Sequence, residues 1–427
     1  MLEVLPFRAT RYDFRRVGGD LSALIAPPYD VLESADKDAL VRKSDHNIVA
    51  VDLPHLPPKS AGPPEAYARS AKRLHDWMGD GTLVHESAPA LYVYHQEYEH
   101  AGRRYTRRKF IARLRLEPFS AGVVLPHEQT FGGPKEDRLA LMKATRCQLS
   151  PIFGLYDDPG NQVNGLFADT TARTPDATAT LDGVVNRVWI VSEQSVTQAV
   201  TSAMASKRVF IADGHHRYGT ALLYRDALVE QQGRPLATNH PANFVMFVLA
   251  GMDDPGCLIL PYFRTLEGVN VPSLVAAWRE GVNVVDHDPR SSPPLTKGGP
   301  GGVDLVLHDG RSGEEVALRF TNRAILRKLE PKQVAPWYDL DYAYLHRYLI
   351  DDLFPKAVGH SAKVHYLKSA DDAKAAAREH AGVALLVNAT PMAHLRAVSE
   401  AGGLMPQKST YFHPKLATGV TLYPLEE

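Results

Sequence analysis

The chain has 427 residues, of which 44% are hydrophobic and 23% charged, and its net charge is −1 with the histidines neutral. This balance is typical of a globular protein of two or three domains. It argues against a protein that holds nucleic acid by bulk positive charge, so nucleic acid is not an expected partner. Two cysteines exclude a disulfide framework. No window approaches the ~20 apolar residues of a membrane span, so we expect a cytoplasmic protein without a membrane partner.

The first half of the chain alternates loop, helix and strand patterns. Residues 54–66 hold five prolines and predict a loop, and residues 65–81 place apolar side chains at helical spacing. Residues 90–98 and 104–116 flank a short Gly-containing turn and predict a β-hairpin. A short helix is expected at 139–145 and a buried strand at 150–156.

The second half continues the alternation. The expected elements are a strand at 208–212 followed by an amphipathic helix, a central strand at 242–252, a hairpin around 308–315, a helix near 339–352, and then strand–helix–strand–helix. In the last helix Thr390 is the expected N-cap, with Pro391 at the first helical position. The predicted fold class is α+β, a mixed α/β chain with antiparallel hairpins.

The Pro/Gly/Ser-rich stretch 287–302 has no periodicity and is the expected linker. We therefore predict a catalytic region at 1–286 and a C-terminal α/β region at 303–427.

The most informative motif is Asp213-Gly214-His215-His216-Arg217, which lies where the strand meets the helix. The first amides of a helix have no partner within the helix, and its N-terminus attracts anions. A glycine lets the backbone approach a ligand closely, and an arginine can bind phosphate oxygens with two donors. The pattern indicates a phosphate site, with Asp213 as a helix cap, a partner that fixes a histidine tautomer, or a Mg²⁺ ligand. The alternative is that Asp213 only caps the helix and the histidines have no function.

A second charged segment is "LPHEQTFGGPKEDRLALMKAT" (125–145). Glu128 could act as a general base, and Lys135 and Arg138 could bind anionic oxygens. The alternative is that Glu136 and Asp137 favour a helix N-terminus while the rest is solvated surface.

Two further loops are weaker candidates. Asp30 follows two prolines in "LIAPPYDVL" (24–32), either as a functional carboxylate or as the cap of a helix that begins near Ser34. Lys408 and Ser409 lie in "LMPQKSTYFHPKLATGV" (404–420), which does not fit the Walker P-loop pattern but could still contact phosphate. The adjacent histidines point to different sides of a helix or strand, so zinc is weakly indicated, and there is no G-x-S-x-G elbow.

Five blocks of the chain, in this order, resemble the bacterial and archaeal domain-of-unknown-function family 1015: "APPYDV", "PHEQT…PKEDRLALMKAT", "SPIFGLYDD", "IADGHHRYGTAL" and "MPQKSTYFHPK". The "DGHHR" block also resembles the ParB-like superfamily, which includes the free-serine kinases. The resemblance implies that residues 213–217 form the donor-phosphate turn and that an upstream acid, Glu128 or Asp30, activates the acceptor hydroxyl.

Motif and resemblance together predict a phosphotransferase that moves a phosphoryl group from pyrophosphate, ADP or ATP to a small hydroxyl substrate such as L-serine, with Mg²⁺ as cofactor. The expected catalytic residues are Glu128, Asp30, His215 and Arg217, and the expected phosphate-binding residues are Asp213, Gly214, His215, His216, Arg217, Lys135, Arg138, Lys408 and Ser409. The alternatives are a nucleotide-binding switch protein without kinase activity and a phosphatase that uses the same anion site.

Overall fold

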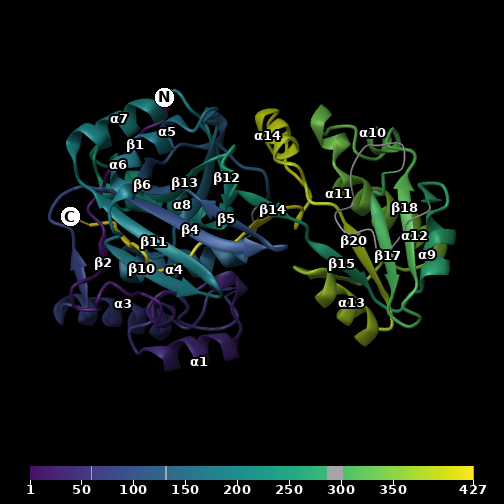
Figure 1. Ribbon diagram of the computed structural model, residues 1–427, viewed down its shortest axis with the longest axis horizontal. Coiled ribbons are helices and arrows are strands. Elements are labelled where there is room, and N and C mark those ends of the chain that lie inside the picture. The colour runs from purple at the N-terminus through teal and green to yellow at the C-terminus, as the bar shows by residue number, and fades with distance from the viewer. Residues whose placement is uncertain (59, 130–131, 286–301, 427) are drawn as a thin grey trace. The chain divides into compact units, whose positions relative to one another are not determined.

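The computed structural model describes residues 1–58, 60–129, 132–285 and 302–426 (Figure 1). The chain forms two compact units. Unit 1 comprises Met1–Pro126, Thr130–Leu258 and Pro414–Glu427, and unit 2 comprises His127–Gln129 and Ile259–His413. These bounds differ from the predicted division at 287–302, since residues 259–286 belong to unit 2 and the chain returns to unit 1 at Pro414. Nearly all of the predicted linker lies outside the described residues.

Unit 1 is built on a ten-stranded mixed sheet with the order β10-β11-β4-β6-β13-β9-β12-β7, to which β1 and β5 add as side branches. The pairs β12–β7 and β13–β9 are parallel, and the remaining pairs are antiparallel. The strands are β1 (Val4–Leu5), β4 (Leu91–His100), β5 (Arg103–Arg107), β6 (Phe110–Arg115), β7 (Val124–Leu125), β9 (Ile152–Tyr156), β10 (Ala177–Leu181), β11 (Val184–Val191), β12 (Val209–Asp213) and β13 (Phe244–Gly251).

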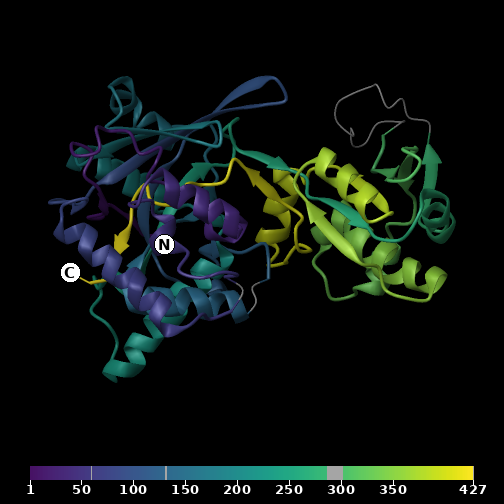
Figure 2. The ribbon, with the colours of Figure 1, turned by 90° about the horizontal axis from the view of Figure 1, so that it is seen from below.

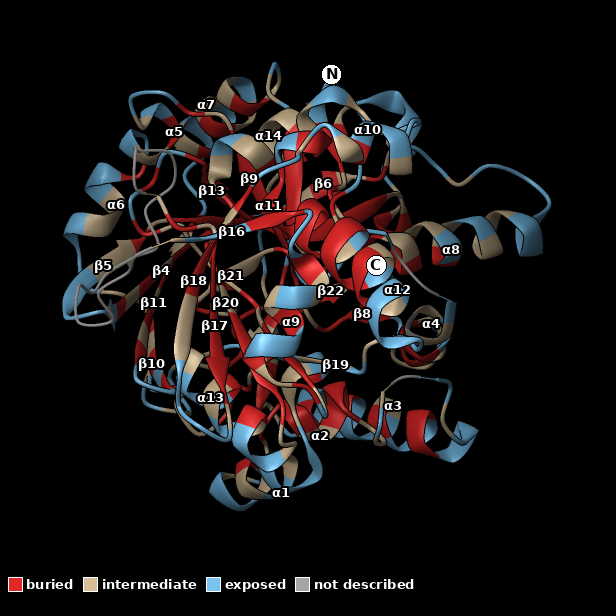
Figure 3. Ribbon diagram, turned by 90° about the vertical axis from the view of Figure 1, so that its right-hand side faces the viewer, coloured by how far each residue is buried: buried red, intermediate tan, exposed pale blue. Residues whose placement is uncertain are grey.

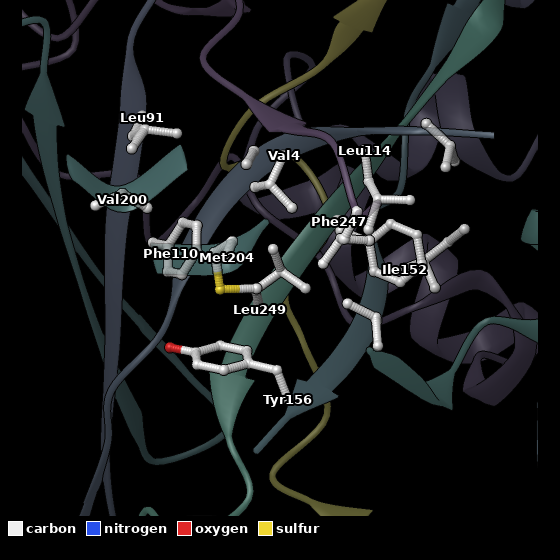
Figure 4. Packing of buried hydrophobic residues seen from close by; sticks show 14 of the residues in the cluster. Val4, Leu91, Phe110, Leu114, Ile152, Tyr156, Val200, Met204, Phe247 and Leu249 are labelled. Atoms are coloured by element: carbon white, nitrogen blue, oxygen red, sulfur yellow. The ribbon is translucent and has the colours of Figure 1, made fainter. Parts of the chain in front are cut away.

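The predicted central strand is β13, which lies between β6 and β9 and has every residue buried. An uninterrupted apolar run is expected of a strand that is covered on both faces. The predicted hairpin is present, but its second arm is divided into β5 and β6, which both pair with β4. The main core covers one face of this sheet, where Leu91, Phe110, Ile152, Phe247 and Leu249 pack together (Figure 4).

The helices of unit 1 are α1 (Ser34–Lys43), α2 (Val49–Asp52), α3 (Pro64–Gly79), α4 (Gly132–Thr145), α5 (Gln162–Gly165), α6 (Ala168–Ala172), α7 (Gln194–Met204) and α8 (His215–Gln232). Prediction and structure agree on α3 and α8, whereas α4 begins earlier than the predicted 139. Two short sheets complete the unit, formed by β2 (Thr10–Tyr12) with β3 (Leu83–His85) and by β8 (Cys147–Gln148) with β22 (Tyr423–Pro424). The last residues, yellow in Figure 2, thus return to unit 1, where Leu422 bridges Thr10.

Unit 2 has a six-stranded antiparallel sheet with the order β16-β18-β17-β20-β15-β19. Its strands are β15 (Phe263–Leu266), β16 (Val282–Val285), β17 (Leu305–Asp309), β18 (Glu315–Phe320), β19 (Val364–Leu367) and β20 (Val383–Val387). Figure 3 shows β17 and β20 buried along almost their whole length. The remaining strands are β14 (Leu258–Leu260), at which the chain enters the unit, and β21 (Tyr411–His413).

The helices of unit 2 are α9 (Val271–Trp278), α10 (Ile325–Leu329), α11 (Asp341–Ala343), the π-helix η5 (Tyr344–Leu353), α12 (Phe354–Val358), α13 (Ala370–Glu379) and α14 (Met392–Glu400). The predicted hairpin, helix near 339–352 and strand–helix–strand–helix series are all present. The predicted cap of α14 is wrong, because Pro391 holds the N-cap position and the hydroxyl of Thr390 donates to the carbonyl of Ser409, 2.8 Å away. In the described parts of the chain, no helix combines the length and the hydropathy that a membrane span requires.

Candidate functional site: a charged strand-to-helix turn

The turn between β12 and α8 depends on a glycine with a left-handed backbone. The apolar residues of β12 are buried and carry the chain to Asp213 at the edge of the core. Gly214 then takes φ 97° and ψ 27° and occupies the N-cap position of α8. Because L-residues rarely adopt such a φ, glycine is required here for the strand to enter the helix without a loop. His215 is buried, and His216 and Arg217 are half-buried in the first turn.

Asp213 does not cap the helix, although both readings of the motif allowed this role, because Gly214 holds the N-cap position. Its Oδ2 accepts a hydrogen bond from Lys415 Nζ at 3.0 Å and lies 3.6 Å from Arg217 Nη2. Burial raises the pKa of Asp213, but the charges of Lys415 and Arg217 outweigh burial and hold this pKa well below its usual range. Asp213 is therefore a carboxylate that holds two cations at the turn.

Arg217 is fixed from several sides. Its Nη1 donates to the carbonyl of Pro151, and a Cβ added to Gly214 would lie 3.0 Å from its Nε. The pKa of Arg217 is lowered by burial and raised by nearby carboxylates, Asp213 first, and the net shift is upward. The guanidinium therefore stays charged beside the N-terminus of α8.

Arg217 also lines a small cavity of about 40 Å³ in unit 1. Its lining combines the polar side chains of Tyr29, Asp52, Arg138 and Ser150 with the apolar side chains of Leu141, Met142, Ile152 and Val245. This volume holds about one to three water molecules. It could therefore admit a hydroxyl or another small polar group close to the guanidinium of Arg217.

Arg138, which lines this cavity, belongs to a buried ion network. Its side chain lies 2.6 Å from Asp137 Oδ2, donates to the carbonyl of Asp52 at 2.7 Å, and stacks 4.0 Å from the ring centre of Tyr29. Asp137 also accepts from Tyr67 at 2.8 Å. The reading of Arg138 as solvated surface is wrong, because its side chain is buried and pairs with the buried carboxylate of Asp137. Arg138 therefore has less charge available for a ligand than Arg217 has.

Lys135 and Asp30 both lie near α8 in unit 1. A Cβ added to Gly219 would lie 3.1 Å from Lys135 Cε, so the stem of Lys135 passes over the helix just beyond its first turn. Asp30 is exposed on the turn Tyr29–Val31 and is among the carboxylates that raise the pKa of Arg217. Asp30 is not the cap of α1, since Glu33 occupies that position.

Lys415, which sequence reasoning did not select as a site residue, is positioned by buried polar side chains on β4 and β5. Arg107 donates to the carbonyl of Pro414, and Gln96 Nε2 donates to the carbonyl of Lys415 at 3.1 Å. Gln96 also accepts from Arg107 and from Lys109, and these two basic side chains are fully buried. Burial holds the pKa of Lys109 well below its usual range. These contacts fix the returning segment so that Lys415 reaches Asp213.

The predicted residues Glu128, Lys408 and Ser409 belong to unit 2, whereas the turn belongs to unit 1. The amide of Met405 donates to the carbonyl of His127 at 2.7 Å, which ties the segment with Glu128 to the loop with Lys408. Buried Arg264 donates to the carbonyl of Lys408 at 2.8 Å and, through Nε, to His346 Nε2 at 3.0 Å. Arg264 therefore holds the loop in which Lys408 takes a left-handed φ of 54°.

The arrangement at Asp213 does not fit the predicted role of Mg²⁺ ligand. The carboxylate already pairs with Lys415 and Arg217, so a divalent cation would meet two positive charges. We derive no step through a metal ion at this residue.

A sequence model of the family described as "Protein of unknown function (DUF1015)" matches residues 4–341, and the chain belongs to this family. A search of curated proteins found no match.

Three solved structures illustrate the structural similarity. A mutant of a free serine kinase in complex with ADP has a TM-score of 0.36 and 13% identity, and the match covers 73% of this chain and 92% of that one. A conserved hypothetical protein from Pyrococcus furiosus has a TM-score of 0.35 and 14% identity, with 73% and 94% covered. SbnI from Staphylococcus aureus, truncated at its C-terminus, has a TM-score of 0.35 and 12% identity, with 74% and 87% covered.

Proposed function

We propose that this protein is a phosphotransferase that moves a phosphoryl group from pyrophosphate or a nucleotide to the hydroxyl group of a small acceptor. The observation that supports this most is the charge at the turn, where Arg217 and Lys415 converge on the one carboxylate of Asp213 beside the N-terminus of α8. Two fixed cations against one anion leave a net positive charge. An added phosphate would balance that charge and accept from the helix amides.

The chemistry needs little more than positioning and charge. Phosphoryl transfer proceeds through a loose transition state, and catalysis consists mainly of orienting the reactants and stabilising negative charge. In our proposal the donor phosphates lie on the first amides of α8, Arg217 binds them with two donors, and His215 and His216 add further donors. Asp213 holds Arg217 and Lys415 in place, and Lys135 contributes positive charge further along the helix.

The acceptor hydroxyl needs a group that takes its proton. Asp30 is the first candidate, because it is exposed in the same unit and close enough to Arg217 for its charge to act on it. Glu128, in unit 2, is the second candidate. A general base typically raises the reaction rate ~10²- to 10⁴-fold. Of the variants Asp30→Asn and Glu128→Gln, the one that removes the base should therefore lower kcat by this factor.

The sequence resemblance of the "DGHHR" block to the free-serine kinases makes L-serine the first acceptor to test. Purified protein is incubated with L-serine and with pyrophosphate, ADP or ATP, with Mg²⁺ and with EDTA, and O-phosphoserine is measured. We expect product with at least one donor. Absence of product with all three contradicts serine as the acceptor.

Two arginines of α8 provide a matched pair of variants. Arg217 and Arg225 each donate from Nη1 to a backbone carbonyl, of Pro151 and of Leu116 respectively. We expect Arg217→Met to lower kcat/KM at least hundredfold and Arg225→Met to leave it within threefold. Equal losses in both variants contradict the assignment of the turn. Donor binding without turnover supports a nucleotide-binding switch instead, and phosphate release from O-phosphoserine without transfer supports a phosphatase.

A further inference from the structure

Three elements of unit 2 bring together two imidazoles and a carboxylate, none of which has a role in the sites described above. Glu267 follows β15, His365 lies in the edge strand β19 opposite Thr265, and His380 follows α13. One potential ligand atom from each lies within 4.8 Å of the other two, and the three side chains are half-buried. Among the described residues this is the one group of His, Cys, Asp or Glu side chains arranged so closely.

The backbone around this cluster is fixed by hydrogen bonds. The amide of Glu267 donates to the carbonyl of Lys363 at 3.2 Å, and the amide of Gly268 donates to the carbonyl of His380 at 3.3 Å. A Cβ added to Gly382 would lie 2.0 Å from the carbonyl oxygen of Leu266, so the turn after α13 packs tightly against the end of β15. The three Cα positions are therefore set by the fold, independently of any contact between the side chains.

The side chains already interact. His365 Nε2 lies 3.2 Å from Glu267 Oε2, and the rings of His365 and His380 stack with their centres 4.5 Å apart. Lys363 Nζ lies 2.7 Å from the same carboxylate oxygen. Imidazole nitrogens with one carboxylate are a donor set of Zn²⁺ and related ions, which need further positions for water.

We propose that Glu267, His365 and His380 bind a divalent transition-metal ion, with Zn²⁺ as the ion to test first. Two adjustments accompany binding. One imidazole turns about its Cβ–Cγ bond, because parallel rings do not direct both nitrogens at one point. Lys363 leaves the carboxylate, and its side chain is 69% exposed, so it is free to do so. The bound ion cross-links β15, β19 and the end of α13 and thereby stabilises the edge of the sheet.

Lys363 competes with the metal ion for the carboxylate of Glu267. Replacing Lys363 should therefore strengthen metal binding, an effect that a loss of folding cannot produce. Full-length protein without a histidine tag is treated with EDTA, dialysed and titrated with ZnCl₂ by calorimetry at pH 7.5, and Co²⁺ binding is followed by visible absorbance. We expect one equivalent to bind in the micromolar range. His380→Gln and Glu267→Gln should each weaken binding at least tenfold, whereas Lys363→Met should tighten it.

His360→Gln is the matched control, since His360 is an exposed histidine of the same unit outside the cluster. Its Zn²⁺ affinity should equal that of the unchanged protein. Zn²⁺ should also raise the Tm of the unchanged protein and not that of His380→Gln. The proposal is overturned if no Zn²⁺ binds, if binding is the same in His380→Gln and Glu267→Gln, or if Lys363→Met binds no more tightly.

Discussion

The two glycines at the ends of α8 allow the geometry of the turn to be tested by single methyl groups. Gly214 precedes the helix with φ 97°, and Gly233 follows it with φ 64°. Alanine is strained at both positions, at roughly 1–2 kcal/mol each. The surroundings differ, since a Cβ at Gly214 would meet Arg217 Nε at 3.0 Å while a Cβ at Gly233 meets nothing within 4 Å.

The contact adds a second cost at Gly214 only. The guanidinium of Arg217 must move by a few tenths of an ångström, which disturbs its contacts with the Pro151 carbonyl and Asp213. Weakening one such hydrogen bond costs roughly 0.5–1.5 kcal/mol. We therefore expect Gly233→Ala to destabilise unit 1 by about 1–2 kcal/mol and Gly214→Ala by about 1.5–3.5 kcal/mol.

The affinity for pyrophosphate distinguishes the two glycines. It is measured by calorimetry for each variant, and the stability of the same variant is measured by urea unfolding. Only Gly214→Ala displaces Arg217, so only this variant should bind pyrophosphate about tenfold more weakly, a loss of about 1.4 kcal/mol. The reasoning is refuted if Gly214→Ala binds within twofold of the unchanged protein, or if Gly233→Ala loses as much affinity.

Three further predictions concern buried charges. Arg138→Met leaves Asp52 and Asp137 buried without their cation and should destabilise unit 1 by about 3–5 kcal/mol in urea unfolding; a loss below about 1 kcal/mol contradicts the network. Burial, and then the charge of Arg264, lower the pKa of His346 to about 3. Below pH 6.5 the unfolded chain therefore takes up a proton that the folded protein excludes, and stability falls by about 2 kcal/mol at pH 5. The variant His346→Gln still accepts from Arg264 but does not titrate. The difference in free energy of unfolding between this variant and the unchanged protein should therefore change by about 2 kcal/mol from pH 7 to pH 5. A difference that stays constant contradicts the assignment. Arg264→Met removes the donor to the carbonyl of Lys408, so amide hydrogen exchange should rise across residues 405–409; unchanged protection there shows that other contacts suffice.

Much of the fold follows from local patterns in the sequence. The apolar run of β13, the amphipathic stripe of α8 and the change from strand to helix at Gly214 each depend on neighbouring residues alone, and all three are present. The two-part arm of the hairpin was not foreseen. Residues 104–116 read as one strand, but Lys109 turns into the buried face and donates to Gln96, and the strand is interrupted there.

The site was only partly predictable because its contacts join distant segments. Lys415 pairs with Asp213 across 202 positions of sequence, and no spacing rule identifies a single lysine near the end of a chain as its partner. Asp137 stands among four consecutive charged residues, a pattern typical of a solvated helix surface. Its burial follows only from tertiary contacts, among them those with Tyr67 on α3 and with His55.

The central claim is that residues 213–217 form the donor-phosphate turn. The most direct test is a crystal structure of the protein soaked with pyrophosphate or with a non-hydrolysable imidodiphosphate. We predict a bound anion within hydrogen-bond distance of the Arg217 guanidinium and of the first amides of α8. An anion that binds elsewhere, with this turn left unchanged, would contradict the account.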